Sequence, residues 1–186
     1  MELMPALKIG WLNGWILLAI EFLIEGFLML IFPKPVVSRL FDRSGWSEEQ
    51  KVFLVVGKVF SIACLVFIIL TPIKINSSGF ILGLVLYGFG LAGFVAALLT
   101  FKDTPLDRPV TKGLYQWSRH PQVVSSFLIL LGICVAIGSW AALFLLVLSR
   151  LFQHFGILAE EKACLKKYGE PYRVYLGRVP RYFLFL

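Results

Sequence analysis

Charged residues, cysteines and histidines are all scarce in this sequence. Asp, Glu, Lys and Arg make up 16% of the 186 residues, whereas a soluble domain is normally about 25% charged. The spacing of the three cysteines, Cys64, Cys134 and Cys164, fits neither a disulfide framework nor a zinc site, so we expect reduced thiols and no metal centre. The chain contains no internal repeat or low-complexity run. These shortages exclude an ordinary soluble domain and a disulfide-stapled one.

Hydrophobic residues, by contrast, account for 59% of the chain and gather in long runs. Several runs reach or approach the roughly 20 residues that span a bilayer. The first run, residues 10–32, is too long for a signal-peptide core and lacks a small-residue cleavage site after it, so we expect a retained helix. The sequence predicts an all-α integral membrane protein, one membrane domain over residues 1–186 with about five transmembrane helices. They are expected at residues 10–32, from Ser47 to about residue 71, and at 79–100, 121–138 and 140–168.

Local signals place the ends of these helices. Ser47–Gln50 has the capping-box pattern, in which the Ser oxygen accepts from the third helical N–H and the Gln side chain reaches back. Pro121 suits the first position of a helix, where its missing N–H costs nothing. Gly169, which follows two lysines and a tyrosine, is expected as a C-terminal cap. A short amphipathic piece is expected at residues 36–41, and the glycines of residues 79–100 should let helices pack closely.

Basic residues are unevenly distributed among the connections. Fourteen Lys and Arg lie in residues 33–51, in 101–120 and in the tail from 160, against only Lys8 and Lys74 in the N-terminus and the other turns. Because basic residues collect on the cytoplasmic side of membrane proteins, this difference predicts a cytoplasmic C-terminal extension. The polar clusters at residues 113–121 and 160–161 would then also face the cytoplasm.

The fourth and fifth predicted helices meet at Gly138-Ser139 with no room for a loop, so we expect a tight antiparallel hairpin. Residues 121–138 would rise about 27 Å and residues 139–160 would descend about 33 Å. Arg119-His120 and Glu160-Glu161 should therefore end within about a turn of each other. This meeting of basic and acidic groups is expected to form either an interfacial salt bridge or a ligand site.

Two carboxylates interrupt the first apolar run. Glu21 and Glu25 are four residues apart and so share one helix face. An ionisable group at membrane depth usually faces protein or a water-filled cavity. The pair either contacts a cationic group of a substrate or of another helix, or is a buried pair satisfied by Lys58 or by hydroxyls.

Two motifs carry a resemblance to a known family. They are GLYQWSRHP at residues 113–121 and EEKACLKKYGEPYRVYLGRVPR at residues 160–181, with the apolar hairpin between them. In this order and spacing the chain resembles the isoprenylcysteine carboxyl methyltransferase and phospholipid methyltransferase superfamily of membrane enzymes. The resemblance covers about residues 104–181, within the motif region at residues 101–186, whereas the N-terminal helices, residues 1–100, are similar only in being apolar.

The resemblance implies an S-adenosyl-L-methionine-dependent methyltransferase that binds its cofactor at the cytoplasmic ends of the last helices. The implied cofactor-binding residues are Gly113, Tyr115, His120, Pro121, Glu160, Glu161 and Tyr172. Arg119 and Glu161 are the expected catalytic residues, with Arg119 fixing a carboxylate of the cofactor or substrate. Methyl transfer needs no metal, and we expect no nucleic-acid partner.

The resemblance also implies a lipophilic acceptor, similar to an isoprenylcysteine carboxylate, that enters from the bilayer. A phospholipid amine, a small thiol or an isoprenoid stays open as well. Glu21 and Glu25 are candidate substrate residues if they face the cavity. Arg150 and His154, four residues apart, either line the acceptor path or are a snorkelling Arg and an interfacial His.

Two other functions compete with methyl transfer. The stretch KKYG at residues 166–169 is similar to the tail of membrane sterol and enone reductases, which bind NADPH. A non-enzymatic small membrane carrier would account for the acidic pair and the glycines. A carrier would leave the ordered polar motifs unexplained.

Overall fold

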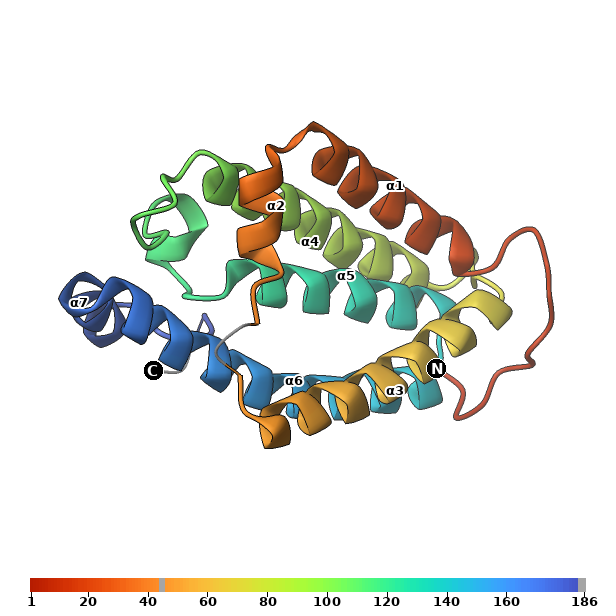
Figure 1. The fold of residues 1–186 in the computed structure, drawn as a ribbon. Helices are drawn as coiled ribbons and strands as arrows, with labels where there is room; N and C mark the ends of the chain where they lie inside the picture. The colour runs from red at the N-terminus through yellow and green to blue at the C-terminus, as the bar shows by residue number, and fades with distance from the viewer. Residues whose placement is uncertain (44–45, 184–186) are drawn as a thin grey trace.

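Helices form nearly all of the regular structure in residues 1–43 and 46–183, the part of the chain that the computed structural model describes (Figure 1). Seven α-helices and one short 3-10 helix, η1, occur in these residues. They are α1 Trp15–Ile31, α2 Lys34–Leu40, α3 Glu48–Leu70, α4 Ser78–Lys102, η1 Gly113–Gln116, α5 Pro121–Ile137, α6 Trp140–Tyr168 and α7 Glu170–Arg178. The same residues contain two isolated β-bridges and no β-strand. The predicted all-α fold is confirmed.

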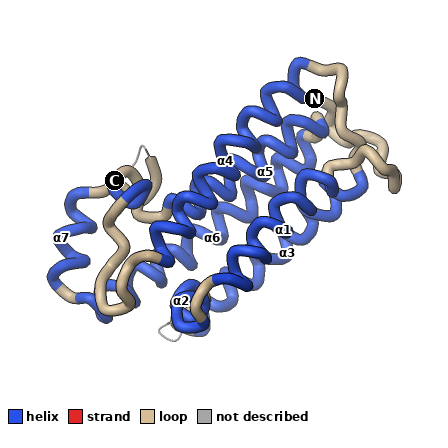
Figure 2. Tube along the Cα trace, turned by 90° about the horizontal axis from the view of Figure 1, so that it is seen from above, coloured by secondary structure: helices blue, strands red, loops and turns tan. Residues whose placement is uncertain are grey.

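The long helices pack as two pairs. α4 lies along α5 and α3 lies along α6, as two views of the chain show (Figures 1 and 2). The first helix, α1, is tied to α4 by the Tyr87 hydroxyl, which donates to the Leu17 carbonyl at 2.9 Å. The two pairs are close where α5 turns into α6 and diverge towards the other end, where α2 and the start of α5 lie (Figure 1). The divergence leaves room for side chains of several elements to converge there.

The predicted turn between the last two membrane helices is present. Gly138 takes the left-handed conformation (φ 67°) and joins α5 to α6 with no loop. Along their lengths, however, the two helices pack mainly against other partners, α5 against α4 and α6 against α3. The hairpin is therefore tight at its turn and open at its other end.

Glycines bring α4 and α5 into backbone contact, as expected for residues 79–100. A Cβ atom built on Gly83 would lie 2.5 Å from the Gly132 carbonyl oxygen, and one built on Gly90 would lie 2.7 Å from the Ile129 nitrogen. Neither neighbour is a flexible side chain, so the helices could not keep this separation with larger residues. The close packing of this pair fixes the position of α5, which begins at the predicted site.

The predicted helix ends are largely confirmed. Ser47 and Gln50 form the reciprocal capping box at the start of α3. Pro121 occupies the first turn of α5, and Gly169 caps α6 with φ 62°. The piece expected at residues 36–41 is the helix α2.

Two short elements were not predicted, and both lie near the polar motifs. They are η1 in the loop before α5, and α7, which begins one residue after the Gly169 cap. Neither element is long enough to show the repeating apolar pattern that indicates a helix in a sequence. Each is held by contacts with distant parts of the chain.

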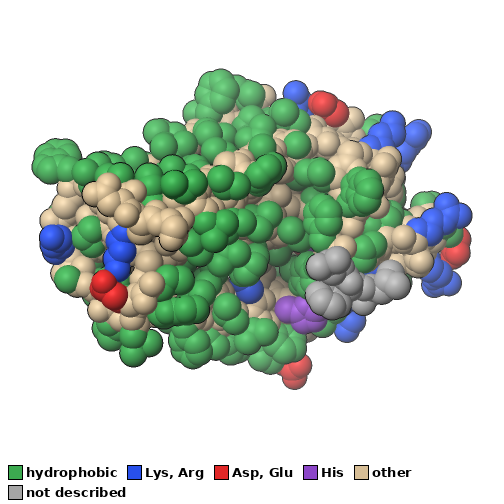
Figure 3. All heavy atoms as spheres, turned by 180° about the vertical axis from the view of Figure 1, so that it is seen from behind, with side chains coloured by type: hydrophobic (Ala, Val, Ile, Leu, Met, Phe, Trp, Pro, Cys, Tyr) green, Lys and Arg blue, Asp and Glu red, His purple; other side chains and the backbone are tan. Residues whose placement is uncertain are grey.

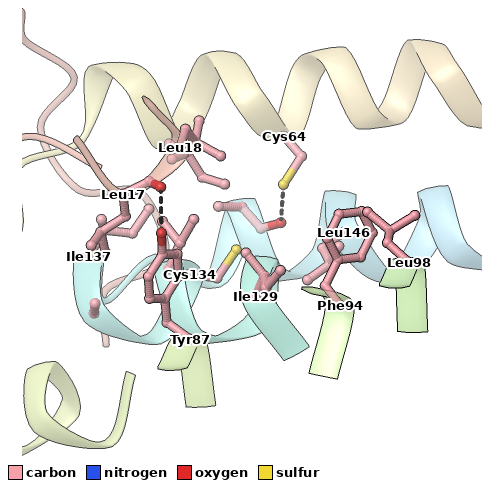
Figure 4. Packing of buried hydrophobic residues seen from close by; sticks show 14 of the residues in the cluster. Leu17, Leu18, Cys64, Tyr87, Phe94, Leu98, Ile129, Cys134, Ile137 and Leu146 are labelled. Atoms are coloured by element: carbon pink, nitrogen blue, oxygen red, sulfur yellow. Dashed lines mark hydrogen bonds between the residues drawn. The ribbon is translucent and has the colours of Figure 1, made fainter. Parts of the chain in front are cut away.

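The described helices suit a membrane. Three of them, α3, α4 and α6, are long and apolar enough to cross one, and α5 is a shorter apolar helix of 17 residues. Buried side chains from α1 to α6 form a continuous core that includes Cys64, Ile129 and Leu146 (Figure 4). Large apolar side chains also point outwards, for example Leu23 at 73% and Phe89 at 72% exposure. The bundle is a membrane protein whose outer surface matches lipid.

The glycine contact predicts a position-specific loss of stability. Gly83→Ala should destabilise the protein by about 1–3 kcal/mol, because the new methyl group would push against backbone of α5. Gly88→Ala is the matched control on the same helix, since its Cβ meets no atom within 4 Å, and it should change stability by at most about 1 kcal/mol. Unfolding by SDS titration in mixed micelles measures both. Equal effects of the two substitutions would contradict the packing argument.

Candidate active site

The two polar motifs meet where the helix pairs diverge. Arg119 and His120 precede α5, and Glu160 and Glu161 lie on α6. The Nε of Arg119 donates to Glu161 Oε1 at 2.8 Å, and His120 Nε2 lies 3.2 Å from the same oxygen. The proximity predicted from the lengths of α5 and α6 is confirmed.

Glu161 is the centre of a buried ion cluster. Its side chain is only 9% exposed, yet it pairs with both Arg119 and Arg181. Arg181 donates to both of its oxygens, through Nε at 3.1 Å to each and through Nη2 to Oε2 at 2.8 Å. This set of charge-assisted bonds satisfies both carboxylate oxygens.

Arg119 also binds the end of α7 and the chain that follows it. Its Nη1 donates to the carbonyls of Leu176 and Val179 at 2.9 and 2.7 Å, and its backbone N–H donates to the Pro180 carbonyl at 2.9 Å. The neighbouring Ser118 hydroxyl donates to the Arg181 carbonyl at 2.9 Å. We call Arg119, Glu161, Arg181 and the backbone of residues 176–180 the clasp, because together they join the start of α5, α6 and the C-terminal segment.

Glu160 differs from its neighbour. Its side chain is 53% exposed, and the Nδ1 of His120 lies 4.0 Å from Glu160 Oε2. Successive helical residues point about 100° apart, so Glu161 turns into the clasp while Glu160 borders a cavity. Glu160 therefore retains acceptor capacity for a ligand.

The cavity has a volume of about 720 Å³, within the range of pockets that hold small molecules and cofactors. One wall is α6, from Gln153 to Lys167, and the opposite wall includes Tyr115 and His120 from the segment before α5. The connection between α2 and α3 and the first turns of α7 complete it. Its charged lining is mixed, since Glu160 stands among Arg and Lys side chains. Such a lining suits a ligand that carries both signs of charge.

Tyrosines shape one end of this cavity. The Tyr175 hydroxyl donates to the Tyr115 carbonyl at 2.7 Å, which joins α7 to η1. The rings of Tyr172 and Tyr175 lie 5.8 Å apart. Burial raises the pKa of Tyr115 and of Tyr172 well above the usual range for phenols, so both hydroxyls stay protonated near neutral pH.

Gly113 and Pro121 position the segment between them. Gly113 has φ 56°, and a Cβ there would meet the Thr100 hydroxyl at 2.8 Å, so glycine is required for two reasons. Pro121 is fully buried at the start of α5. Both residues act through the backbone that carries Tyr115 and His120 to the cavity.

The four candidate substrate residues lie apart from the cavity lining. Glu21 is buried on α1, and Glu25 is half-buried one turn later. His154 Nδ1 lies 3.0 Å from the Tyr182 hydroxyl, and Arg150 donates to Gln153 Oε1. Their roles stay predictions.

Three residues of this site were not singled out from the sequence. Arg181 completes the clasp; it ends the second motif, but the sequence did not indicate that it would pair with Glu161. Trp46 lines the cavity against α6, where its ring comes within 3.1 Å of a Cβ built on Gly156. Arg39 also lines it and donates to three carbonyls of the loop before η1. Both come from the connection between α1 and α3, which the motifs do not include.

Metal binding has no obvious place here. No group of three or more His, Cys, Asp or Glu side chains within residues 1–43 and 46–183 is arranged to hold an ion. The arrangement offers instead hydrogen-bond acceptors, fixed cations and aromatic walls. It is equipped to bind and orient a charged organic molecule.

The comparison with protein families gives a match to part of the chain. Residues 100–171 match the family model described as phospholipid methyltransferase. The comparison with curated proteins gave no match, and neither did the comparison with solved structures. The resemblance seen in the motifs is confirmed, and the matched segment contains η1, His120, the hairpin and both carboxylates. It supports a membrane methyltransferase.

The clasp predicts different effects for the two adjacent carboxylates. Glu161→Gln should cost about 3–5 kcal/mol, because it leaves the buried Arg119 without a counter-charge. Glu160→Gln, the control one residue away, should cost at most about 1 kcal/mol because its side chain is half-exposed. The free energy of unfolding in mixed micelles measures both. If Glu161→Gln is as mild as Glu160→Gln, the clasp does not stabilise the fold.

Proposed function

We propose, from the phospholipid methyltransferase domain at residues 100–171, that the protein transfers a methyl group from S-adenosylmethionine to a lipophilic acceptor in the membrane. One observation carries the proposal. Inside the matched segment, Glu160 and His120 border a cavity of about 720 Å³ at one end of the apolar helices. A water-soluble charged cofactor and a lipid acceptor could therefore meet there.

The residues present fit this cofactor. S-adenosylmethionine, when bound, supplies a methyl group whose carbon is already activated, because it is attached to a positively charged sulfur. Glu160 offers carboxylate oxygens to its ammonium group or ribose hydroxyls. The basic residues of the lining, such as Arg43, offer donors to its carboxylate. Tyr115 and Tyr172 offer aromatic surface to its adenine.

For Arg119 and Glu161 we propose a positioning role. Their polar atoms are engaged with each other, with Arg181 and with backbone carbonyls. Such groups orient His120 and α7 around the cofactor without contacting the transferred methyl. Orientation of this kind matters, because aligned reactants can save about 7–11 kcal/mol of a barrier.

The acceptor is proposed to be a membrane lipid. The name of the matched family makes a phospholipid headgroup amine the first candidate, and an isoprenylcysteine-like carboxylate is the second. The two differ in what the protein must do. A carboxylate attacks as it is, whereas an ammonium group must first lose a proton to an acceptor such as His120 or Glu160.

We also propose that the cavity faces the cytoplasm. The segments that surround it, residues 33–51, 101–120 and the tail from 160, contain fourteen Lys and Arg, against two in the segments at the other end. A cytoplasmic position agrees with the positive-inside rule. It would also give access to the cofactor pool of the cell.

Cofactor binding tests the proposal directly. The purified protein should be stabilised against heat by S-adenosylmethionine and by its demethylated product, and not by NADPH. Glu160→Gln should weaken this binding about tenfold, because a hydrogen bond to a charged acceptor is lost. Glu170→Gln, an exposed carboxylate on α7 outside the cavity lining, should leave it unchanged.

Radiolabelled transfer then separates the acceptors. Label from S-adenosylmethionine should enter phosphatidylethanolamine or N-acetyl-S-farnesylcysteine in reconstituted vesicles. Stabilisation by NADPH alone would favour the reductase alternative. An absence of response to either cofactor would favour the carrier.

The orientation can be tested with reporters at the C-terminus. A fluorescent protein fused after Leu186 should fluoresce in a bacterial host, because that end is expected in the cytoplasm. Alkaline phosphatase fused at the same place should be inactive. The opposite pair of results would place the cavity on the outer side.

A further inference from the structure

Arg150 lies on the face of α6 that borders the cavity. It precedes Gln153 and Ile157, two lining residues, by three and seven positions, and such residues share a helix face. It also lies ten residues from Glu160, which corresponds to about 15 Å along the helix axis. Arg150 is thus placed beyond the deep end of the cavity, within the apolar part of α6.

This arginine is incompletely satisfied. Its Nη1 donates to Gln153 Oε1, while its Nε is buried and has no hydrogen-bond partner. No ion pair to Arg150 is found in the described part of the chain. Since a charge at membrane depth is costly unless it is paired, an unpaired guanidinium with a free N–H needs an anion.

The acidic side chain that acts electrostatically on Arg150 is Glu21 of α1, which makes no direct contact with it. Glu21 itself has neither a hydrogen bond nor an ion pair among residues 1–43 and 46–183. The other groups that act electrostatically on Arg150 are the Cys64 thiol and the Tyr182 hydroxyl. The chain therefore brings acidic and basic groups near each other and leaves both without a close partner.

The surroundings of Arg150 are open to lipid. On α6, Val147 precedes Arg150 by three positions, so it shares the same helix face, and it is 43% exposed. Figure 3 shows one face of the molecule, on which hydrophobic side chains cover much of the surface. A ligand that reaches Arg150 would come from the bilayer with an apolar tail.

We infer that Arg150 binds the anionic group of the lipid acceptor, a phosphate or a carboxylate, and so selects acceptors that carry one. The inference rests on the proposed function, because it assigns a role in that reaction. The guanidinium fork matches either oxyanion. With the cofactor near Glu160, about 15 Å away along α6, the reactive atom of the acceptor would lie between the two.

Binding of short lipids tests the inference without measuring activity. Dihexanoyl phosphatidic acid is compared with dihexanoylglycerol, and N-acetyl-S-farnesylcysteine with its methyl ester, by thermal unfolding of the full chain in detergent. Each anionic probe should stabilise the protein more than its neutral partner. Stabilisation by the first pair alone identifies a phosphate site, and by the second pair alone a carboxylate site.

Substitutions assign the response to Arg150. Arg150→Gln should weaken binding of the anionic probe about 10- to 100-fold. Lys58→Gln, which removes an exposed cation from α3, should leave it unchanged. If Arg150→Gln does not fold, Arg150→Lys keeps the charge and loses the fork, and should still weaken binding.

Two results would overturn the inference. One is an Arg150→Gln protein that keeps the preference for anionic probes. The other concerns stability: Arg150→Gln destabilises the protein, the added substitution Glu21→Gln restores its stability, and the double variant still prefers the anionic probes. That result would make Arg150 a partner of Glu21 only. In transfer assays, Arg150→Gln should raise the KM for the acceptor and leave S-adenosylmethionine binding unchanged. A wild-type protein without cofactor binding would instead refute the proposed function.

Discussion

The cavity depends on the ion pairs that the carboxylate of Glu161 makes. This carboxylate lies almost out of contact with solvent and joins Arg119 before α5 to Arg181 after α7, segments 62 residues apart in the sequence. Two guanidinium groups this close would repel each other without it. Because Arg119 also holds the backbone of residues 176–180, the same carboxylate keeps α7 against the cavity. The tyrosines of α7 thus owe their positions to a bond made on α6.

Much of the fold could be predicted because its signals are local. The Ser47 capping box, Pro121 and Gly169 satisfy or avoid backbone groups within one turn, so the chain near them is sufficient to indicate a helix end. The pairing of helices could not be predicted in this way. A helix that faces lipid is apolar all round, so its sequence does not show which side meets protein. The short elements η1 and α7 could not be predicted either, because contacts with distant parts of the chain hold them.

The candidate site, too, could be predicted from the sequence only in part. The lengths of α5 and α6 were enough to bring Arg119 and Glu161 together, since the rise of a helix is fixed. Which of two adjacent carboxylates turns inwards was not predictable. That choice depends on Arg181, the last residue of the second motif, and the motif does not specify which carboxylate Arg181 contacts. Glu160 and Glu161 cannot be told apart in the sequence. Only their surroundings make Glu161 part of the clasp and leave Glu160 free to bind a ligand.

The helix α6 therefore presents three polar groups, Glu160 and Glu161 on different faces at one height and Arg150 about 15 Å away, and each meets a different environment. Glu161 is enclosed by cations and has no capacity left for a ligand. Glu160 is half-exposed beside a cavity of mixed charge, where a water-soluble molecule can compete for it. Arg150 lies deeper, where water is scarce and a free N–H is costly. A lipid that carries an anion is suited to Arg150, and a charged soluble cofactor is suited to Glu160. One helix can thus hold the two reactants of a methyl transfer in line, because its own periodicity sets the spacing between their sites.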